Sequence, residues 1–156
     1  MRVILASDHV GLGLKHTIMA RFAGANLGST GLELADLGTH TKARIDYPPI
    51  AWRTSALVTS GQAERAILIC GSGVGMAIAA NKVPGIRAVV CSEPYSAAAS
   101  RRHNNSNVLA LGSRVVGPDL AVLIVQAWLQ ADFCGGRHSH RLTQISQIEN
   151  HYQTPS

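Results

Sequence analysis

A cysteine that opens a glycine-rich loop is the feature of this sequence best suited to chemistry. Cys70 ends the apolar run 66–69 and is followed by Gly71, Gly73 and Gly75. A loop with so few side chains can turn its backbone N–H groups toward an oxyanion, and the start of a helix would add a favourable dipole. The same dipoles favour thiolate over thiol, the form that a nucleophile or a base requires. The alternative interpretation is a buried cysteine beside a tight turn.

Several familiar loop chemistries do not fit this stretch. A Walker loop requires Gly-Lys-Ser/Thr, whereas this loop continues as Gly-Val-Gly-Met-Ala. The glycine spacing is G-x-G-x-G, which differs from the G-x-G-x-x-G of dinucleotide-binding folds. A cysteine phosphatase would need an arginine six residues after Cys70, and the residue there is Met76. The loop therefore predicts neither nucleotide binding nor phosphatase activity.

Two further residue pairs have the chemistry for proton transfer. Asp8 and His9 follow the apolar run 2–7, and an acid–base pair there could move protons between oxygens. The alternative is an N-cap aspartate beside a surface histidine. His103 and Asn104 end an Ala-rich helical segment, where they could serve as a general acid with a positioning amide. A helix C-cap is the alternative for this second pair.

A third group of candidates lies near the C-terminus. Arg137 and Arg141 are four residues apart, so on a helix they share a face. Two guanidinium groups that converge on one point suit a phosphate, although a solvated helix face is the alternative. His138 and His140 suggest a metal, but on a helix their rings point in different directions. No metal site is predicted.

The elements that must position these groups alternate between two kinds of pattern. Short apolar runs predict strands, and apolar residues at helical spacing predict helices between them. The predicted strands cover residues 2–7, 32–38, 65–71, 86–92 and 107–113. The predicted helices cover residues 11–24, a segment ending near 61, 75–83, 93–104, 118–131 and 135–152. This order predicts an α/β fold: a three-layer αβα sandwich with a five-stranded parallel Rossmann-like sheet.

Length, charge and cysteine usage narrow the class of protein. The 156 residues predict a single domain over residues 1–150 with a short tail over 151–156. The net charge of +5 comes with no basic run longer than Arg-Arg and with only 4% aromatic residues, which favours a small anionic substrate over nucleic acid. The odd count of three cysteines without a C-x-x-C motif argues against disulfides or zinc.

The distribution of apolar residues predicts a cytoplasmic protein. Each apolar run is interrupted before it reaches the length of a membrane span. The apolar part of the N-terminal stretch MRVILASDH is too short for a signal peptide, and an acidic residue follows it too early. It is instead predicted to be the first strand, and no membrane partner is expected.

Taken together, these stretches resemble the type B ribose-5-phosphate isomerases, a family that includes galactose-6-phosphate isomerase subunits and allose-6-phosphate isomerases. The matching stretches are SDHVG, DYP, ILICGSGVGMAIAANKVPGIRAVVCSEPYSA, SRRHNNSNVLALGSRVVG and GGRH. The resemblance implies isomerisation of ribose 5-phosphate to ribulose 5-phosphate through an enediolate, in the pentose phosphate pathway. It implies no metal or organic cofactor. It also implies a homodimer or larger assembly whose subunits share each site.

The resemblance also implies a role for each candidate side chain. Cys70 would take the proton from C2 of the sugar and return it to C1, while Ser72 would donate to an enediolate oxygen. Asp8 as base and His103 as acid would open the furanose ring beforehand. Some members of the family carry a glutamate base where this chain has Met76, so the chain falls in the cysteine-based group.

Substrate contacts follow from the same resemblance. His9, Arg137 and Arg141 match phosphate-binding positions, and Tyr47 in the DYP stretch matches the rim of the site. The implied contacts in full are Asp8, His9, Gly71, Ser72, Gly73, Val74, Gly75, Asn104, Arg114, Arg137 and Arg141. One alternative is a six-carbon substrate such as allose 6-phosphate, because one extra carbon is discriminated only modestly. The other is a sugar-phosphate-binding module without catalysis, which would need the arginines but not the thiol and the acid–base pair.

Overall fold

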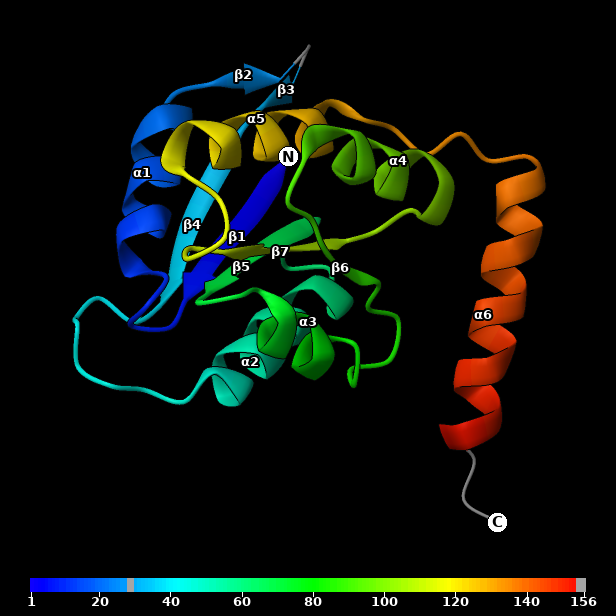
Figure 1. Ribbon diagram of the computed structural model, residues 1–156. Helices are drawn as coiled ribbons and strands as arrows, with labels where there is room; N and C mark the ends of the chain where they lie inside the picture. Colours follow the sequence, from blue (N-terminus) through cyan, green and yellow to red (C-terminus); the bar gives the residue numbers. More distant parts are fainter. Residues whose placement is uncertain (28–29, 154–156) are drawn as a thin grey trace.

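Five parallel strands form the central sheet of the protein, which is described over residues 1–27 and 30–153 in a computed structural model (Figure 1). The strands are β1 (Arg2–Ser7), β4 (Glu33–Gly38), β5 (Arg65–Cys70), β6 (Ala88–Val90) and β7 (Val108–Gly112). They lie in the order β4-β1-β5-β7-β6. The chain thus builds the sheet outward in both directions from the β1–β5 pair, and the carboxyl ends of all five strands share one edge.

Helices cover both faces of this sheet, so the predicted three-layer α/β fold is confirmed (Figure 1). One face packs against α1 (Leu12–Phe22), α4 (Pro94–Asn104) and α5 (Pro118–Gln130). The other packs against α2 (Tyr47–Thr59) and α3 (Val74–Ala80). Alternate strand residues point to opposite faces, so Ile67 joins the first core and Leu68 the second. Because both faces are covered, β5 is buried along its whole length.

The last helix, α6 (Arg137–Gln153), lies outside these layers (Figure 1). His138 is its one buried residue among those with a described side chain, whereas the apolar Ile145 and Ile148 are 48% and 61% exposed. The helix was predicted over residues 135–152 and ends one residue later, at Gln153, while residues 154–156 lie outside the described part of the chain. None of the described helices is long and apolar enough to span a membrane.

The observed elements differ from the predicted ones mainly at their ends. A small hairpin, β2 (Asn26–Leu27) with β3 (Thr30–Gly31), was not predicted. The edge strand β6 pairs only with β7 and only over three residues, although its apolar run is longer. Ile86 and Cys91, just beyond its ends, are buried without belonging to the strand. An apolar run therefore predicts which residues are buried, but not how many of them pair with a neighbouring strand.

Candidate active site

An open cleft of about 640 Å³ lies at the carboxyl ends of β1 and β5. The direction in which the sheet is built changes between these two strands, and such a switch point is where open parallel sheets bind ligands. The cleft is lined by Asp8, Val10, Tyr47, Cys70, Gly71, Ser72, Val74, Gly75, Ile78, Arg114 and Val115. It thus brings together the thiol, the glycine loop and the first aspartate, which are far apart in the sequence.

Cys70 is the last residue of β5 and is only 5% exposed. The N–H of Gly73 donates a hydrogen bond to its Sγ atom at 3.2 Å. Gly73 adopts φ +79°, a left-handed conformation that favours glycine, and an added Cβ would lie 3.0 Å from the carbonyl carbon of Leu111. The loop therefore turns sharply around the sulfur because position 73 has no side chain.

The other side of the loop is fitted to Tyr47. A Cβ at Gly75 would lie 2.6 Å from Cζ of the phenol ring, so the ring can pack on the loop only because position 75 is glycine. Tyr47 is held there as the first residue of α2, whose first turn contains Pro48. On the solvent side, the hydroxyl oxygen of Ser72 accepts a hydrogen bond from the N–H of Val74 at 3.3 Å. The hydroxyl hydrogen of Ser72 therefore stays free to donate.

Asp8 is buried on the wall of the cleft, with 6% of its surface exposed. Its Oδ1 atom accepts the N–H groups of Val10 and Gly11, both at 2.9 Å. These bonds fix the carboxylate at the turn that precedes α1. No residue in the described part of the chain donates to the second oxygen, Oδ2, so that oxygen keeps its capacity to accept a proton.

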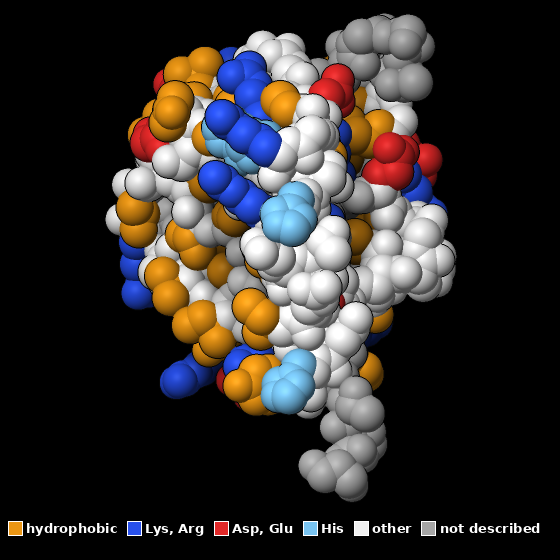
Figure 2. Space-filling model, turned by 90° about the vertical axis from the view of Figure 1, so that its right-hand side faces the viewer, with side chains coloured by type: hydrophobic (Ala, Val, Ile, Leu, Met, Phe, Trp, Pro, Cys, Tyr) orange, Lys and Arg blue, Asp and Glu red, His pale blue; other side chains and the backbone are white. Residues whose placement is uncertain are grey.

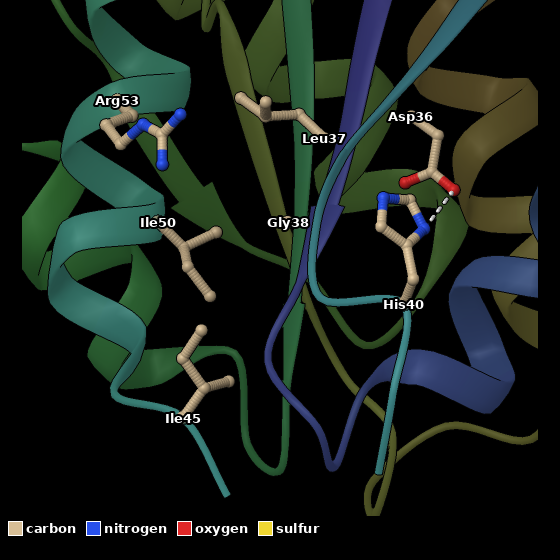
Figure 3. A pocket seen from close by; sticks show the side chains of 7 residues that line it. All are labelled: Asp36, Leu37, Gly38, His40, Ile45, Ile50 and Arg53. Carbon is tan, nitrogen blue, oxygen red and sulfur yellow. Dashed lines mark ion pairs between the residues drawn. The ribbon is translucent and has the colours of Figure 1, made fainter. Parts of the chain in front are cut away.

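His9 lies beside the cleft rather than on its wall. Its Nδ1 atom accepts the N–H of Ile45 at 3.3 Å, so a neutral ring carries its proton on Nε2. Ile45 also lines a second cavity of about 170 Å³ between the end of β4 and α2 (Figure 3). There Asp36 binds the buried amine of Lys15 and lies 3.6 Å from His40. This neighbouring cavity contains none of the predicted site residues.

A second cluster of candidates lies away from the cleft, at the end of α4 and the start of α6. The rings of His103 and His138 stack with their centroids 4.4 Å apart and their planes at 15°. Burial lowers the pKa of His138, as do the positive charges of His103, Arg137 and Arg141. Figure 2 shows basic side chains gathered beside a histidine near one end of the long helix. Such a group of cations is suited to a phosphate.

The candidate residues thus fall into two groups within one chain. The cleft holds Asp8, Cys70, Ser72 and Arg114, whereas His103 and the two α6 arginines do not line it. His138 was weighed from the sequence only as a metal ligand, whereas its ring stacks on that of the candidate His103. Its spacing of three residues from the second arginine, which places both on one helix face, was the available signal.

The comparisons with known proteins agree with this architecture. The family model described as Ribose/Galactose Isomerase matches residues 3–145. The chain belongs to the ribose/galactose isomerase family. Within it, ribose-5-phosphate isomerase B of Escherichia coli strain K12 is 53% identical over 148 residues, which is 95% of this chain and 96% of that protein. The resemblance predicted from the sequence is therefore confirmed.

Solved structures of the family match along nearly the whole chain. Ribose-5-phosphate isomerase B of Clostridium thermocellum superposes with a TM-score of 0.90 at 50% identity, covering 98% of this chain and 100% of that one. Ribose-5-phosphate isomerase B of Mycoplasma genitalium, solved with bound ribulose-5-phosphate, gives a TM-score of 0.88 at 37% identity, with 98% and 97% covered. The family fold thus extends over both groups of candidate residues.

Proposed function

We propose that this protein is an aldose–ketose isomerase that interconverts D-ribose 5-phosphate and D-ribulose 5-phosphate through an enediolate. The observation that carries the proposal is the buried thiol of Cys70, which meets a backbone N–H and faces a cleft that also holds Asp8. The names of close relatives in the family supply the substrate. We place the reaction in the cytoplasm, within the pentose phosphate pathway, and without a metal or organic cofactor.

The isomerisation step needs one base that reaches two neighbouring carbons. Cys70 removes the proton from C2 and returns it to C1, while a proton is transferred from the C2 oxygen to the C1 oxygen. Negative charge develops on these oxygens, and Ser72 and the remaining loop amides are donors suited to stabilising it. Met76 is buried and has no group that could accept a proton, so no second base stands nearby on α3.

Ring opening requires a second acid–base pair, because the substrate is mainly a furanose. Asp8 takes the proton from the C1 hydroxyl through its free oxygen. His103 protonates the ring oxygen as the bond between C1 and the ring oxygen breaks. His9, Arg137 and Arg141 bind the phosphate. Asn104 and Arg114 are the further substrate contacts, and the glycine loop with Val74 forms the floor under C1 and C2.

Because His103 and the arginines lie away from the cleft of their own chain, we propose a homodimer with shared sites. The cluster of one subunit completes the cleft of its partner. Two observations support this arrangement. The apolar Ile145 and Ile148 of α6 are exposed, and Val74, Ile78 and Val115 at the cleft are 49%, 58% and 60% exposed. Both apolar surfaces are of the kind that a second subunit covers.

A turnover assay on the purified protein tests the proposal. We expect kcat/KM to be higher with ribose 5-phosphate than with allose 6-phosphate. A higher value with the six-carbon sugar would move the function to that substrate. Binding of either sugar phosphate without turnover would show a binding module and would contradict the isomerase assignment.

A further inference from the structure

The turn that leads into β6 holds the last part of α6 in place. Both carboxylate oxygens of Glu149, which lies on α6 and is partly buried, accept the backbone N–H of Gly85 at 3.0 Å. The turn itself is fixed by Asn107, whose side chain accepts the N–H of Arg87 at 2.8 Å and donates to the carbonyl of Gly85 at 2.9 Å. The carboxylate of α6 therefore binds a turn that is itself held by two side-chain hydrogen bonds.

The same turn also holds the end of α4. The Nε atom of Arg87 donates to the carbonyls of Asn104 and Asn105, each at 3.0 Å. These carbonyls belong to the C-terminus of α4, where a cation is favourable because the last carbonyls lack helical partners. The negative charge of Glu149 also acts on this guanidinium. Arg87 thus stands between the two helices that carry the second cluster.

These contacts fix α6 at two separate points. At one end, His138 stacks on His103 of α4. At the other end, Glu149 reaches the β6 turn, eleven residues or about 16 Å further along the helix. The chain enters α6 through Gly135 and Gly136, both in left-handed conformations with φ +63° and +57°. Since glycine has wide conformational freedom, this entrance alone cannot set the direction of the helix.

We propose that Glu149 and Arg87 are positioning residues that together hold the phosphate-binding arginines and His103 in register. The inference rests on the proposed function, since it takes Arg137 and Arg141 as phosphate contacts. Neither Glu149 nor Arg87 touches the substrate. Glu149 binds α6 to the β6 turn, and Arg87 binds the same turn to the end of α4, so the two residues form a latch. Loss of the Glu149 contact would weaken phosphate binding in the ground state and the transition state alike, so KM should rise with little change in kcat. Loss of Arg87 would also release the end of α4 that carries His103, so it should lower kcat as well.

The test compares Glu149→Ala, Glu149→Gln and Arg87→Met with wild type in steady-state turnover of ribose 5-phosphate. We expect KM to rise about tenfold in Glu149→Ala and Arg87→Met, with kcat changed less than about threefold in Glu149→Ala and lowered further in Arg87→Met. Glu149→Gln keeps an acceptor for the Gly85 N–H and should restore part of the loss. The control is Glu33→Ala, which removes an exposed carboxylate paired with Arg2 at 3.1 Å on β4, the edge strand at the other side of the sheet from β6. Its KM should equal that of wild type.

Two further measurements distinguish a latch that directs α6 from a contact that holds subunits together. Calorimetric titration with inorganic phosphate measures the phosphate affinity of the arginine cluster without turnover. The latch can therefore be tested even if ribose 5-phosphate proves not to be the substrate. Sedimentation velocity at the assay concentration reports assembly. The double variant Arg87→Met with Glu149→Ala should lose less than the product of the single effects, because both residues act through the same β6 turn.

Three results would overturn the proposal. The first is a Glu149→Ala variant with the KM and phosphate affinity of wild type. The second is a full multiplicative effect of the two substitutions, which would mean that they act separately. The third is a rise in KM that appears only where sedimentation shows loss of assembly, since the residues would then hold subunits together rather than direct α6.

Discussion

At the scale of single residues, the three thiols differ in their surroundings. Cys70 lines the cleft, with a backbone N–H on its sulfur. Burial, together with the charge of Glu93, raises the pKa of Cys91 to about 11. Cys134 is exposed. Iodoacetamide at about pH 8 should therefore modify Cys70 and Cys134 but leave Cys91 intact, because the reacting form is the thiolate.

To check this order of reactivity, the extent of modification of each cysteine is measured by mass spectrometry and compared with the residual activity. In a Cys134→Ser background, loss of turnover should follow modification of Cys70 in a one-to-one ratio, and saturating sugar phosphate should slow both. Inactivation that follows modification of Cys91 would contradict the assignment of the base.

Replacement of the base itself gives a second prediction at this scale. Cys70→Ala should lower kcat by about 10²-fold to 10⁴-fold, the usual contribution of a positioned general base. Substrate affinity, measured by calorimetry, should stay near that of wild type because the sulfur acts on the C2 proton and not on ground-state binding. Turnover within about tenfold of wild type would show that another group removes the proton.

At the scale of elements, the end of α4 is held by an unusual residue conformation. Asn105 is the one non-glycine residue in the described ranges with positive φ, at +46°, and its side chain accepts from the buried guanidinium of Arg101 at 2.8 Å. A β-branched residue is strained in this conformation. Asn105→Val should lower the free energy of unfolding by about 1–3 kcal/mol. Asn105→Gly, which keeps the backbone conformation, should lose less.

Urea denaturation of the two variants measures the difference. Equal losses would mean that the Arg101 contact, and not the left-handed backbone, stabilises the C-terminus of α4. Because His103 precedes this cap by two residues, the Asn105→Val variant should also show a lower kcat than Asn105→Gly.

The elements themselves were largely predictable from sequence, for a physical reason. Strands β1, β5 and β7 are buried on both faces, so each reads as an unbroken apolar run. The short hairpin β2–β3 has two-residue strands, too short for any periodicity to register. Residues at strand ends, such as Cys70 and Asp8, could be placed together because parallel strands share one carboxyl edge. The pairing of His138 with His103 could not, since it depends on where α6 lies in space.

At the scale of the whole molecule, the separation of the cleft from the α4–α6 cluster is the decisive feature. Family resemblance led to the expectation of a shared site, but periodicity and spacing carry no information about which surface faces a second copy. A single chain displays an apolar cleft rim and an apolar face of α6, both without a cover in the described residues. A two-fold axis would place the cleft rim of each subunit against the α6 face of its partner, so the same contact would form twice.

Mixing two inactive variants tests this arrangement directly. Cys70→Ala disables the cleft, and Arg137→Ala combined with His103→Asn disables the cluster. If sites are shared, a hybrid dimer has one site with both defects and one site with none, because its intact cleft meets the partner's intact cluster. Random exchange of subunits after unfolding and refolding should then restore about a quarter of wild-type activity, since half of the dimers are hybrids with one working site of two. If each chain used its own cluster, every site in the mixture would carry one defect, and activity would stay at the level of the separate variants.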